Sequence, residues 1–480
     1  MAVVEPLRVF FIPLMSPGHM IPMVDMAKLF SRHGASATIV TTPGNEPLVR
    51  PSVAGSSVDL LLLPFPPSAA ELLPGGRENL TFMPKSDHAR FFDAFFALRP
   101  SLEALLRARR PDCIVTDTMY AWTADAAAAL GIPRLVFHGH GTFPQCVHES
   151  LHLRGTHKKK KSEEESFLVE GIPDRVELRK SEVSSIFQWE AALDFWKEAE
   201  EKSFGVVVNS FYALEPEYAE LYRRKPGRRA WCVGPVSLAN CKGSTSIRSR
   251  GGNNNHPEVE RCLEWLDSVG TAGSVVYVCF GSLNEFEPEQ LDEIASGLEE
   301  SGYGFVWVVR NSGWAAEEGF EERVKGRGVI IRGWAPQTLI LGHPAVGGFV
   351  THCGWNSTLE GVAAGVPMVT WPVEYEQFVN EKLICQVLGV GVGVERGEAG
   401  AVVRKEAVAK AVAEAMGGGR EGERRREMAR EYAAMAAAAV EEGGSSYMDT
   451  AGLIQELLEF RAQAQSARPN WTQTQTQLCF

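Results

Sequence analysis

A short stretch in the second half of the chain gathers side chains that could bind a phosphorylated ligand. His352 ends an apolar run that is typical of a buried parallel strand, and Asn356 and Ser357 follow it closely. Ser357 and Glu360 have the S-x-x-E spacing of a capping box, which predicts a helix that ends at Gly365. Free N–H groups and the dipole at a helix N-terminus favour a pyrophosphate. An ordinary turn between strand and helix would show the same pattern, so the motif alone leaves both interpretations open.

His19 is a second candidate, because it lies between two predicted elements near the N-terminus. Residues 7–13 are typical of a strand, and residues 20–33 have the spacing of an amphipathic helix that Gly34 ends. A helix dipole favours the neutral form of a histidine at the helix N-terminus, and a general base must be neutral. A lone histidine is more often solvated or packed in a core, so the spacing leaves the role undecided.

Asp117 is the candidate partner of His19, since it ends the predicted strand Cys113–Asp117. Parallel strands end at one edge of a sheet, where open α/β folds bind ligands. A carboxylate at that edge could fix the tautomer of an imidazole and stabilise the imidazolium that forms when it takes a proton. The same residue could instead cap a helix that begins near Tyr120.

Residues 334–377 resemble the signature segment of the plant family 1 UDP-dependent glycosyltransferases, in length, at both ends and at nearly every motif position. The resemblance implies a UDP-sugar site whose members also include Gly354 and Ser282, the serine of an FGS turn. The roles that it implies are stacking on uracil for Trp334 beside Ala335 and Gln337, ribose binding for Glu360, phosphate binding for His352, Asn356 and Ser357, and contact with the sugar for Trp355, Glu376 and Gln377. A glutamine at the last position usually accompanies glucose in this family.

The resemblance extends from about Pro6 to Phe460 and includes both N-terminal candidates. His19 in its GHMIP context and Asp117 resemble the catalytic dyad of the family. The overall pattern is most similar to the group with glucosyltransferases for flavonoids, steroids and triterpenoids. Two features depart from it: the pair Glu374-Tyr375 replaces smaller or less polar residues, and Gly139 stands where several relatives carry a threonine thought to contact the sugar.

The order of predicted elements indicates an α/β protein with parallel sheets, because strand patterns alternate with helical ones. The resemblance implies two Rossmann-like domains facing each other across a cleft, the GT-B fold. We expect an acceptor-binding domain at 1–241, a flexible linker at 242–257 that is rich in Gly, Ser and Asn, and a UDP-sugar-binding domain at 258–449. A helix at 450–462 should return to the first domain, and residues 463–480 should form a disordered tail.

The composition of the chain limits the kinds of partner and the cellular compartments that we expect for the protein. The chain has 480 residues, of which 45% are hydrophobic, and this suffices for two sizeable cores. A formal net charge of −12 argues against nucleic acid as a partner. The nine cysteines show no metal-ligand spacing, and no apolar run is long enough to span a bilayer. We expect a cytoplasmic monomer with free thiols, no stable membrane insertion, and no metal or other cofactor besides the UDP-glucose co-substrate.

The acceptor should bind in the first domain, in an apolar pocket for a small lipophilic molecule. The candidates are Met15, Met20, Phe82, Met83, Phe92, Phe95, His138, Phe143, Phe187 and, from the signature segment, Tyr375. Each of them could instead be packed in the core. Nothing in the sequence selects a flavonoid over a triterpenoid, a steroid, a hormone or a xenobiotic.

The expected reaction is a single in-line displacement that inverts the anomeric carbon and gives a β-O-glucoside. A dehydrogenase would also have twin Rossmann-like halves, but the first strand-to-helix turn, residues 15–19, is no GxGxxG motif. An enzyme of the same fold with another UDP-sugar donor would also fit the pattern, as would a homologue that only binds UDP-sugars or small lipophiles. Intact His19, Asp117 and Gln377 argue against a protein that only binds.

Overall fold

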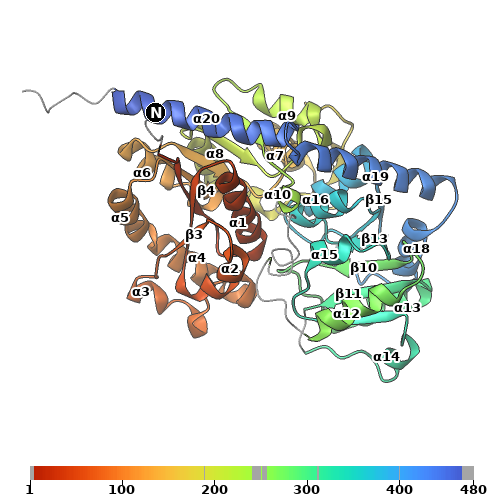
Figure 1. Ribbon diagram of the computed structural model, residues 1–480. Coiled ribbons are helices and arrows are strands. Elements are labelled where there is room, and N and C mark those ends of the chain that lie inside the picture. Colours follow the sequence, from red (N-terminus) through yellow and green to blue (C-terminus); the bar gives the residue numbers. More distant parts are fainter. Residues whose placement is uncertain are drawn as a thin grey trace, which may run out of the picture.

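The structure is a computed structural model that describes residues 5–188, 190–239, 250, 257–310, 313–398 and 400–466. Two parallel sheets, each with helices packed around it, lie side by side (Figure 1). The long helices α19 (Arg420–Val440) and α20 (Ser445–Ser466) run across the top of both in that view. The predicted α/β fold class is therefore confirmed.

The first sheet has seven strands in the order β3-β2-β1-β4-β5-β8-β9. Its strands are β1 Arg8–Ile12, β2 Ser36–Thr41, β3 Asp59–Leu62, β4 Cys113–Asp117, β5 Arg134–Phe137, β8 Gly205–Val208 and β9 Ala230–Cys232. Strand β1 pairs in parallel with both β2 and β4, so the chain winds outward in two directions from the boundary between β1 and β4. Loops at such a boundary diverge and leave a crevice at the carboxyl ends of the strands.

The second sheet has six strands in the order β12-β11-β10-β13-β14-β15. They are β10 Val275–Cys279, β11 Gly304–Val309, β12 Gly328–Arg332, β13 Val346–Thr351, β14 Met368–Thr370 and β15 Gly391–Gly393. Its equivalent boundary lies between β10 and β13, which pair in parallel. Each sheet therefore offers one crevice at the carboxyl ends of its strands.

Helices of the first part connect and cover its sheet: α1 Pro17–Arg32, α2 Glu46–Val53, α3 Pro67–Ala70, α4 His88–Ala97, α5 Arg99–Arg109, α6 Thr123–Leu130, α7 Thr142–Arg154, α8 Glu190–Glu201, α9 Pro216–Arg223 and α10 Val236–Ala239. Those of the second part are α12 Pro257–Ser268, α13 Pro288–Ser301, α14 Phe320–Arg323, α15 Gln337–Leu341, α16 Trp355–Ala364, α17 Gln377–Lys382 and α18 Lys405–Met416, followed by α19 and α20. A short antiparallel hairpin joins β6 (Ser166–Leu168) to β7 (Glu177–Arg179).

The predicted strands at 7–13 and 113–117 and the apolar run that ends at His352 coincide with β1, β4 and β13 to within a few residues, whereas β3, β14 and β15 were not predicted. Strand β3 has four residues, and β14 and β15 have three each, so their patterns are too brief to separate from a loop. The predicted linker and tail lie largely outside the described residues, and the predicted domain limits stay predictions. No helix in the described ranges is long and apolar enough to cross a membrane.

Helix α20 completes the core of the first sheet although it follows the second sheet in the chain. Leu453, Ile454 and Leu457 are buried in one cluster with residues of β1, β2, β4 and β5. Asp449 accepts a hydrogen bond from the backbone N–H of Cys232 at 2.8 Å. Helix α20 therefore packs against the first sheet, and it extends beyond the segment 450–462 at both ends, from Ser445 to Ser466.

Candidate active site between the two sheets

The sheet boundary between β1 and β4 places His19 and Asp117 in contact. Helix α1 begins at Pro17, earlier than predicted, so that His19 lies in its first turn. Asp117 is the last residue of β4. The Nδ1 atom of His19 lies 2.5 Å from Oδ2 of Asp117, and Oδ1 accepts a hydrogen bond from the N–H of Met119 at 3.0 Å. Asp117 therefore caps the turn that follows β4 and holds the imidazole at the same time.

The charge state of His19 differs from the expectation based on the helix dipole. Burial lowers the pKa of His19, but the charge and hydrogen bond of Asp117, together with the charge of Glu376, outweigh it and raise the pKa above 6.5. The prediction that the neutral form is favoured is wrong, because the paired carboxylate stabilises the imidazolium more than burial destabilises it. A higher pKa makes the neutral ring a stronger base.

A cavity of about 220 Å³ opens beside His19 at the crevice of the second sheet, and we call it the donor cavity. All predicted members of the UDP-sugar site line it: Ser282, Trp334, Ala335, Gln337, His352, Gly354, Trp355, Asn356, Ser357, Glu360, Glu376 and Gln377. Their binding roles stay predictions. Two arginines outside the predicted set, Arg250 and Arg310, also line the cavity.

Helix α16 begins earlier than the predicted capping box requires. Its first residue is Trp355 and its N-cap is Gly354, so Ser357 lies inside the first turn and cannot cap it. Ser357 and Glu360 accept hydrogen bonds from Nε2 of Gln337 at 3.0 and 2.8 Å. Glu360 also pairs with Arg250 at 2.6 Å, and Arg250 reaches Asp25 of α1 at 2.7 Å. The S-x-x-E spacing thus brings two polar side chains to one face of the helix instead of closing its end.

The ring of His352 lies against two backbone positions, 281 and 354, that have room only for glycine. A Cβ on Gly281 would lie 2.5 Å from the His352 ring, and one on Gly354 would lie 2.4 Å from it. Gly281 also has a φ of +79°, which favours glycine. Burial lowers the pKa of His352 to about 4, so the ring is neutral at physiological pH. A neutral imidazole can donate one N–H to a phosphate oxygen.

Two residues at the start of α16 connect the two halves of the cleft. Nδ2 of Asn356 donates to the carbonyl of Gly18, next to His19, at 2.6 Å. Nε1 of Trp355 donates to the carbonyl of Asn209 at 2.7 Å, and the side chain is buried. The Trp355 ring was expected to face the sugar, but its N–H is occupied by this contact with the first half of the chain.

Gln377 is held in one orientation by the backbone. Its side-chain carbonyl accepts hydrogen bonds from the N–H groups of Val373 and Glu374 at 2.9 and 3.0 Å. The amide nitrogen is thereby left to donate on the other side. Glu376 next to it has a raised pKa because of its burial, which the charge of His19 partly offsets.

A second cavity of about 360 Å³, here called the acceptor cavity, lies on the other side of His19. Four predicted residues line it: Phe92, His138, Phe187 and Tyr375. The other candidates do not, because Met15, Met20, Met83, Phe95 and Phe143 are packed in the core and Phe82 is half exposed outside the cavity. For these six residues the prediction is wrong, and all but Phe82 are core residues instead.

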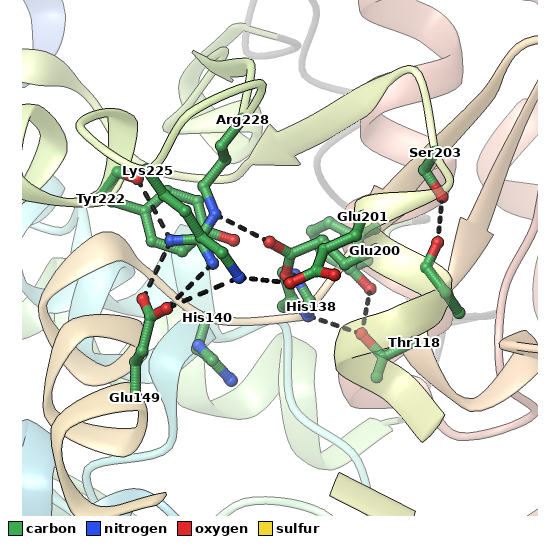
Figure 2. A network of polar contacts seen from close by, with 12 residues as sticks. Thr118, His138, His140, Glu149, Glu200, Glu201, Ser203, Tyr222, Lys225 and Arg228 are labelled. Carbon is green, nitrogen blue, oxygen red and sulfur yellow. Dashed lines mark hydrogen bonds and ion pairs between the residues drawn. The ribbon is translucent and has the colours of Figure 1, made fainter. Parts of the chain in front are cut away.

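The remaining wall of the acceptor cavity is more polar than predicted, as Figure 2 shows in part. His138 contacts Thr118 at 2.7 Å and Glu200 at 2.9 Å, and Arg228 contacts Glu200 and Glu149, each at 2.9 Å. His140, Gln145, His148 and His152 complete this side. The close spacing of four histidines between residues 138 and 152 was a signal that could have located it.

Metal ligands were not expected, and none of the His, Cys, Asp and Glu residues in the described ranges form a group of three or more that could hold a metal ion. Metal-independent activity stays a prediction.

Comparison with known proteins agrees with this geometry. Residues 241–416 match the family model of UDP-glucoronosyl and UDP-glucosyl transferases. Scopoletin glucosyltransferase of Nicotiana tabacum is 45% identical over 471 residues, which cover 94% of this chain and 98% of that relative. Abscisate beta-glucosyltransferase of Phaseolus angularis is 43% identical over 478 residues, covering 94% and 96%.

A solved structure extends the agreement to three dimensions. UGT73P12 of Glycyrrhiza uralensis, complexed with glycyrrhetinic acid 3-O-monoglucuronide, is 39% identical and superposes with a TM-score of 0.89 over 96% of this chain and 97% of that one. The chain therefore belongs to the plant UDP-glycosyltransferases and is an enzyme of the GT-B fold.

Proposed function

We propose that the chain is an inverting UDP-glucosyltransferase that transfers glucose from UDP-glucose to a hydroxyl group of a lipophilic plant metabolite. One observation carries the proposal: the His19–Asp117 pair borders both cavities, since His19 lines the donor cavity and the acceptor cavity alike. A base at this junction is placed between an acceptor hydroxyl on one side and an anomeric carbon on the other.

In the proposed reaction, Nε2 of His19 removes the proton of the acceptor hydroxyl while Asp117 holds Nδ1 and stabilises the imidazolium. The acceptor oxygen attacks the anomeric carbon of the α-linked donor as the bond to the UDP oxygen breaks. The products are a β-O-glucoside and UDP. The start of α16 and neutral His352 stabilise the charge that grows on the leaving diphosphate.

Glucose is the proposed sugar for two reasons. Gln377 is fixed with its amide nitrogen free of the backbone bonds that hold its carbonyl, and such a donor suits a sugar hydroxyl. In addition, several similar proteins are named glucosyltransferases, for scopoletin, flavonoid and abscisate among others. Independence from metal ions and a cytoplasmic location belong to the same proposal.

The test is a panel of flavonols, triterpenoid and steroid aglycones and simple phenols, each incubated with UDP-glucose, UDP-galactose or UDP-glucuronate in EDTA, with products identified by mass. A gain of one hexose from UDP-glucose alone would support the proposal. Transfer from another donor would overturn the choice of glucose, and activity that EDTA abolishes would overturn metal independence. No transfer despite measurable UDP binding would favour a homologue that only binds.

A further inference from the structure

The acceptor cavity contains polar atoms that the protein itself leaves unsatisfied. Nε2 of Gln145 and Nε2 of His148 are both buried, and neither has a hydrogen-bond partner among the described residues. Both side chains line the acceptor cavity and lie three residues apart on helix α7, hence on one face of it. Buried polar atoms are normally paired, because leaving one unpaired is costly.

A series of close neighbours leads from His19 through residues 139 and 140 to His148. A Cβ on Gly139 would come within 3.5 Å of the His19 ring, so residue 139 borders the base directly. The neighbouring His140 ring lies 5.6 Å from the His148 ring, and His148 in turn lies 5.4 Å from the ring of Phe187. Residues 139 and 140 thus lie between His19 and His148, and Gln145 lies one turn before His148 on α7.

The two unsatisfied side chains carry no charge of their own at neutral pH. Burial, and then the charge of His138, lower the pKa of His148 to about 4, and burial also lowers the pKa of His140. Two cations line the cavity. Arg228 is already engaged by Glu200 and Glu149 and stacks on Tyr222 at 4.1 Å (Figure 2), and Lys197 lies on α8, on a different helix from Gln145 and His148. At neutral pH, His148 thus presents a dipole and not a charge.

We propose that Gln145 and His148 form a specificity subsite for a second, uncharged hydroxyl group of the acceptor, remote from the hydroxyl that receives the sugar. A hydroxyl fits both atoms because it accepts from the amide N–H of Gln145 and can donate to an imidazole nitrogen or accept from it. The acceptor class is accordingly a polyhydroxylated phenolic molecule. This inference rests on the proposed function.

The experiment uses two matched pairs of phenols that differ in length, with UDP-glucose as donor. They are 2-naphthol with 2,6-dihydroxynaphthalene, and 4-phenylphenol with 4,4′-dihydroxybiphenyl. We expect wild-type kcat/KM to favour the diol of at least one pair by roughly tenfold or more, beyond the twofold that two equivalent hydroxyls provide. The pair that shows the preference reports the depth of the subsite.

Variants then assign the preference to the two side chains. His148→Phe should lower kcat/KM for the preferred diol roughly 10–100-fold and leave the mono-ol within about threefold, and Gln145→Leu should act in the same direction. His157→Phe is the matched control, since His157 also packs against Phe187, at 5.4 Å, but lies outside the acceptor cavity. It should leave the ratio between diol and mono-ol unchanged.

Equal use of both members in both pairs by the wild type would overturn this inference while leaving the proposed function intact. So would an equal loss on diol and mono-ol in both cavity variants. Absence of transfer to all four phenols by the wild type would likewise overturn this inference. The proposed function falls only if the triterpenoid and steroid aglycones and the flavonols of the panel above also receive no sugar.

Discussion

The two cavities that meet at His19 are built in different ways. The donor cavity is framed by main chain at the ends of strands, and its polar side chains hold one another, as Gln337 holds Glu360 and the backbone holds Gln377. The acceptor cavity is lined by side chains of helices that are far apart in the chain. Some of their buried polar atoms have no hydrogen-bond partner among the described residues. A site built from main chain suits a ligand that stays the same, such as the donor. Side chains on helices can be substituted without a change in the sheet, which suits an acceptor that differs between enzymes.

The largest expected effect comes from the residue shared by both cavities. His19→Ala should lower kcat about 10²–10⁴-fold, because the acceptor hydroxyl loses its base. The dissociation constant of UDP, measured by calorimetry, should stay within a few-fold of the wild type. Near-normal turnover on an acceptor that is protonated at the assay pH would contradict the assignment.

A change confined to the donor cavity should instead weaken the binding of UDP. Glu360→Gln should do so roughly 10–100-fold, because a charged acceptor of hydrogen bonds from the ribose is lost. The matched control is Glu381→Gln, which alters another buried glutamate of the same half, paired with Arg396 at 2.6 Å. If UDP bound equally well to the Glu360 variant, the predicted ribose contact would be wrong.

The connection between the halves can be tested through stability. Trp355→Phe removes the hydrogen bond to Asn209 and leaves a buried carbonyl unsatisfied, which should cost about 1–3 kcal/mol. Trp314→Phe is the control, since its indole bonds Asp292 within one half at 2.9 Å. In calorimetry, the Trp355 variant should lower the transition temperature and separate the unfolding of the two halves, and the control should not separate them. A single unshifted transition in the Trp355 variant would count against a structural role.

The smallest expected effect is a displacement of the pH profile. His19 must be neutral to act, and its pKa is raised by Asp117, so kcat/KM should fall as the pH falls through a value above 6.5. In Asp117→Asn, burial dominates and lowers the pKa of His19, so the acidic limb should move to lower pH while the maximum rate drops. If the acidic limb of the kcat/KM profile lay at the same pH in the wild type and in Asp117→Asn, a group other than His19 would be responsible for it.

One part of the donor cavity, from His352 to Glu360, could be predicted from the order of elements because its residues are contiguous, whereas Ser282, Trp334, Glu376 and Gln377 were placed there only by the family resemblance. A buried strand, a glycine-rich turn and a helix follow one another in residues 346–364, and the strand-to-helix order alone puts their polar residues at one sheet edge. The capping box was misplaced because S-x-x-E also arises when both residues lie on one face of a helix that has already begun.

The acceptor half was poorly predicted because core and cavity use the same residue types. Met15 and Phe143 are fully buried in packing, Phe92 and Phe187 line the cavity, and nothing in their local sequence separates the two groups. Which helix faces leave space depends on long-range packing of α4, α7, α8 and the hairpin region. The polar wall of the acceptor cavity was not predicted, because the expected acceptor was lipophilic and mainly apolar residues were therefore chosen as candidates.

The position of α20 near the end of the sequence affects the order in which the two halves can fold during synthesis. The side chains of Leu453, Ile454 and Leu457 belong to the core beneath the first sheet, yet they are translated after the whole second sheet. During synthesis, part of the apolar core of the N-terminal half stays uncovered until α20 has been made. The second half can fold as soon as it leaves the ribosome. We therefore expect the half that contains the base to be the last to mature, and the more dependent of the two on chaperones during synthesis.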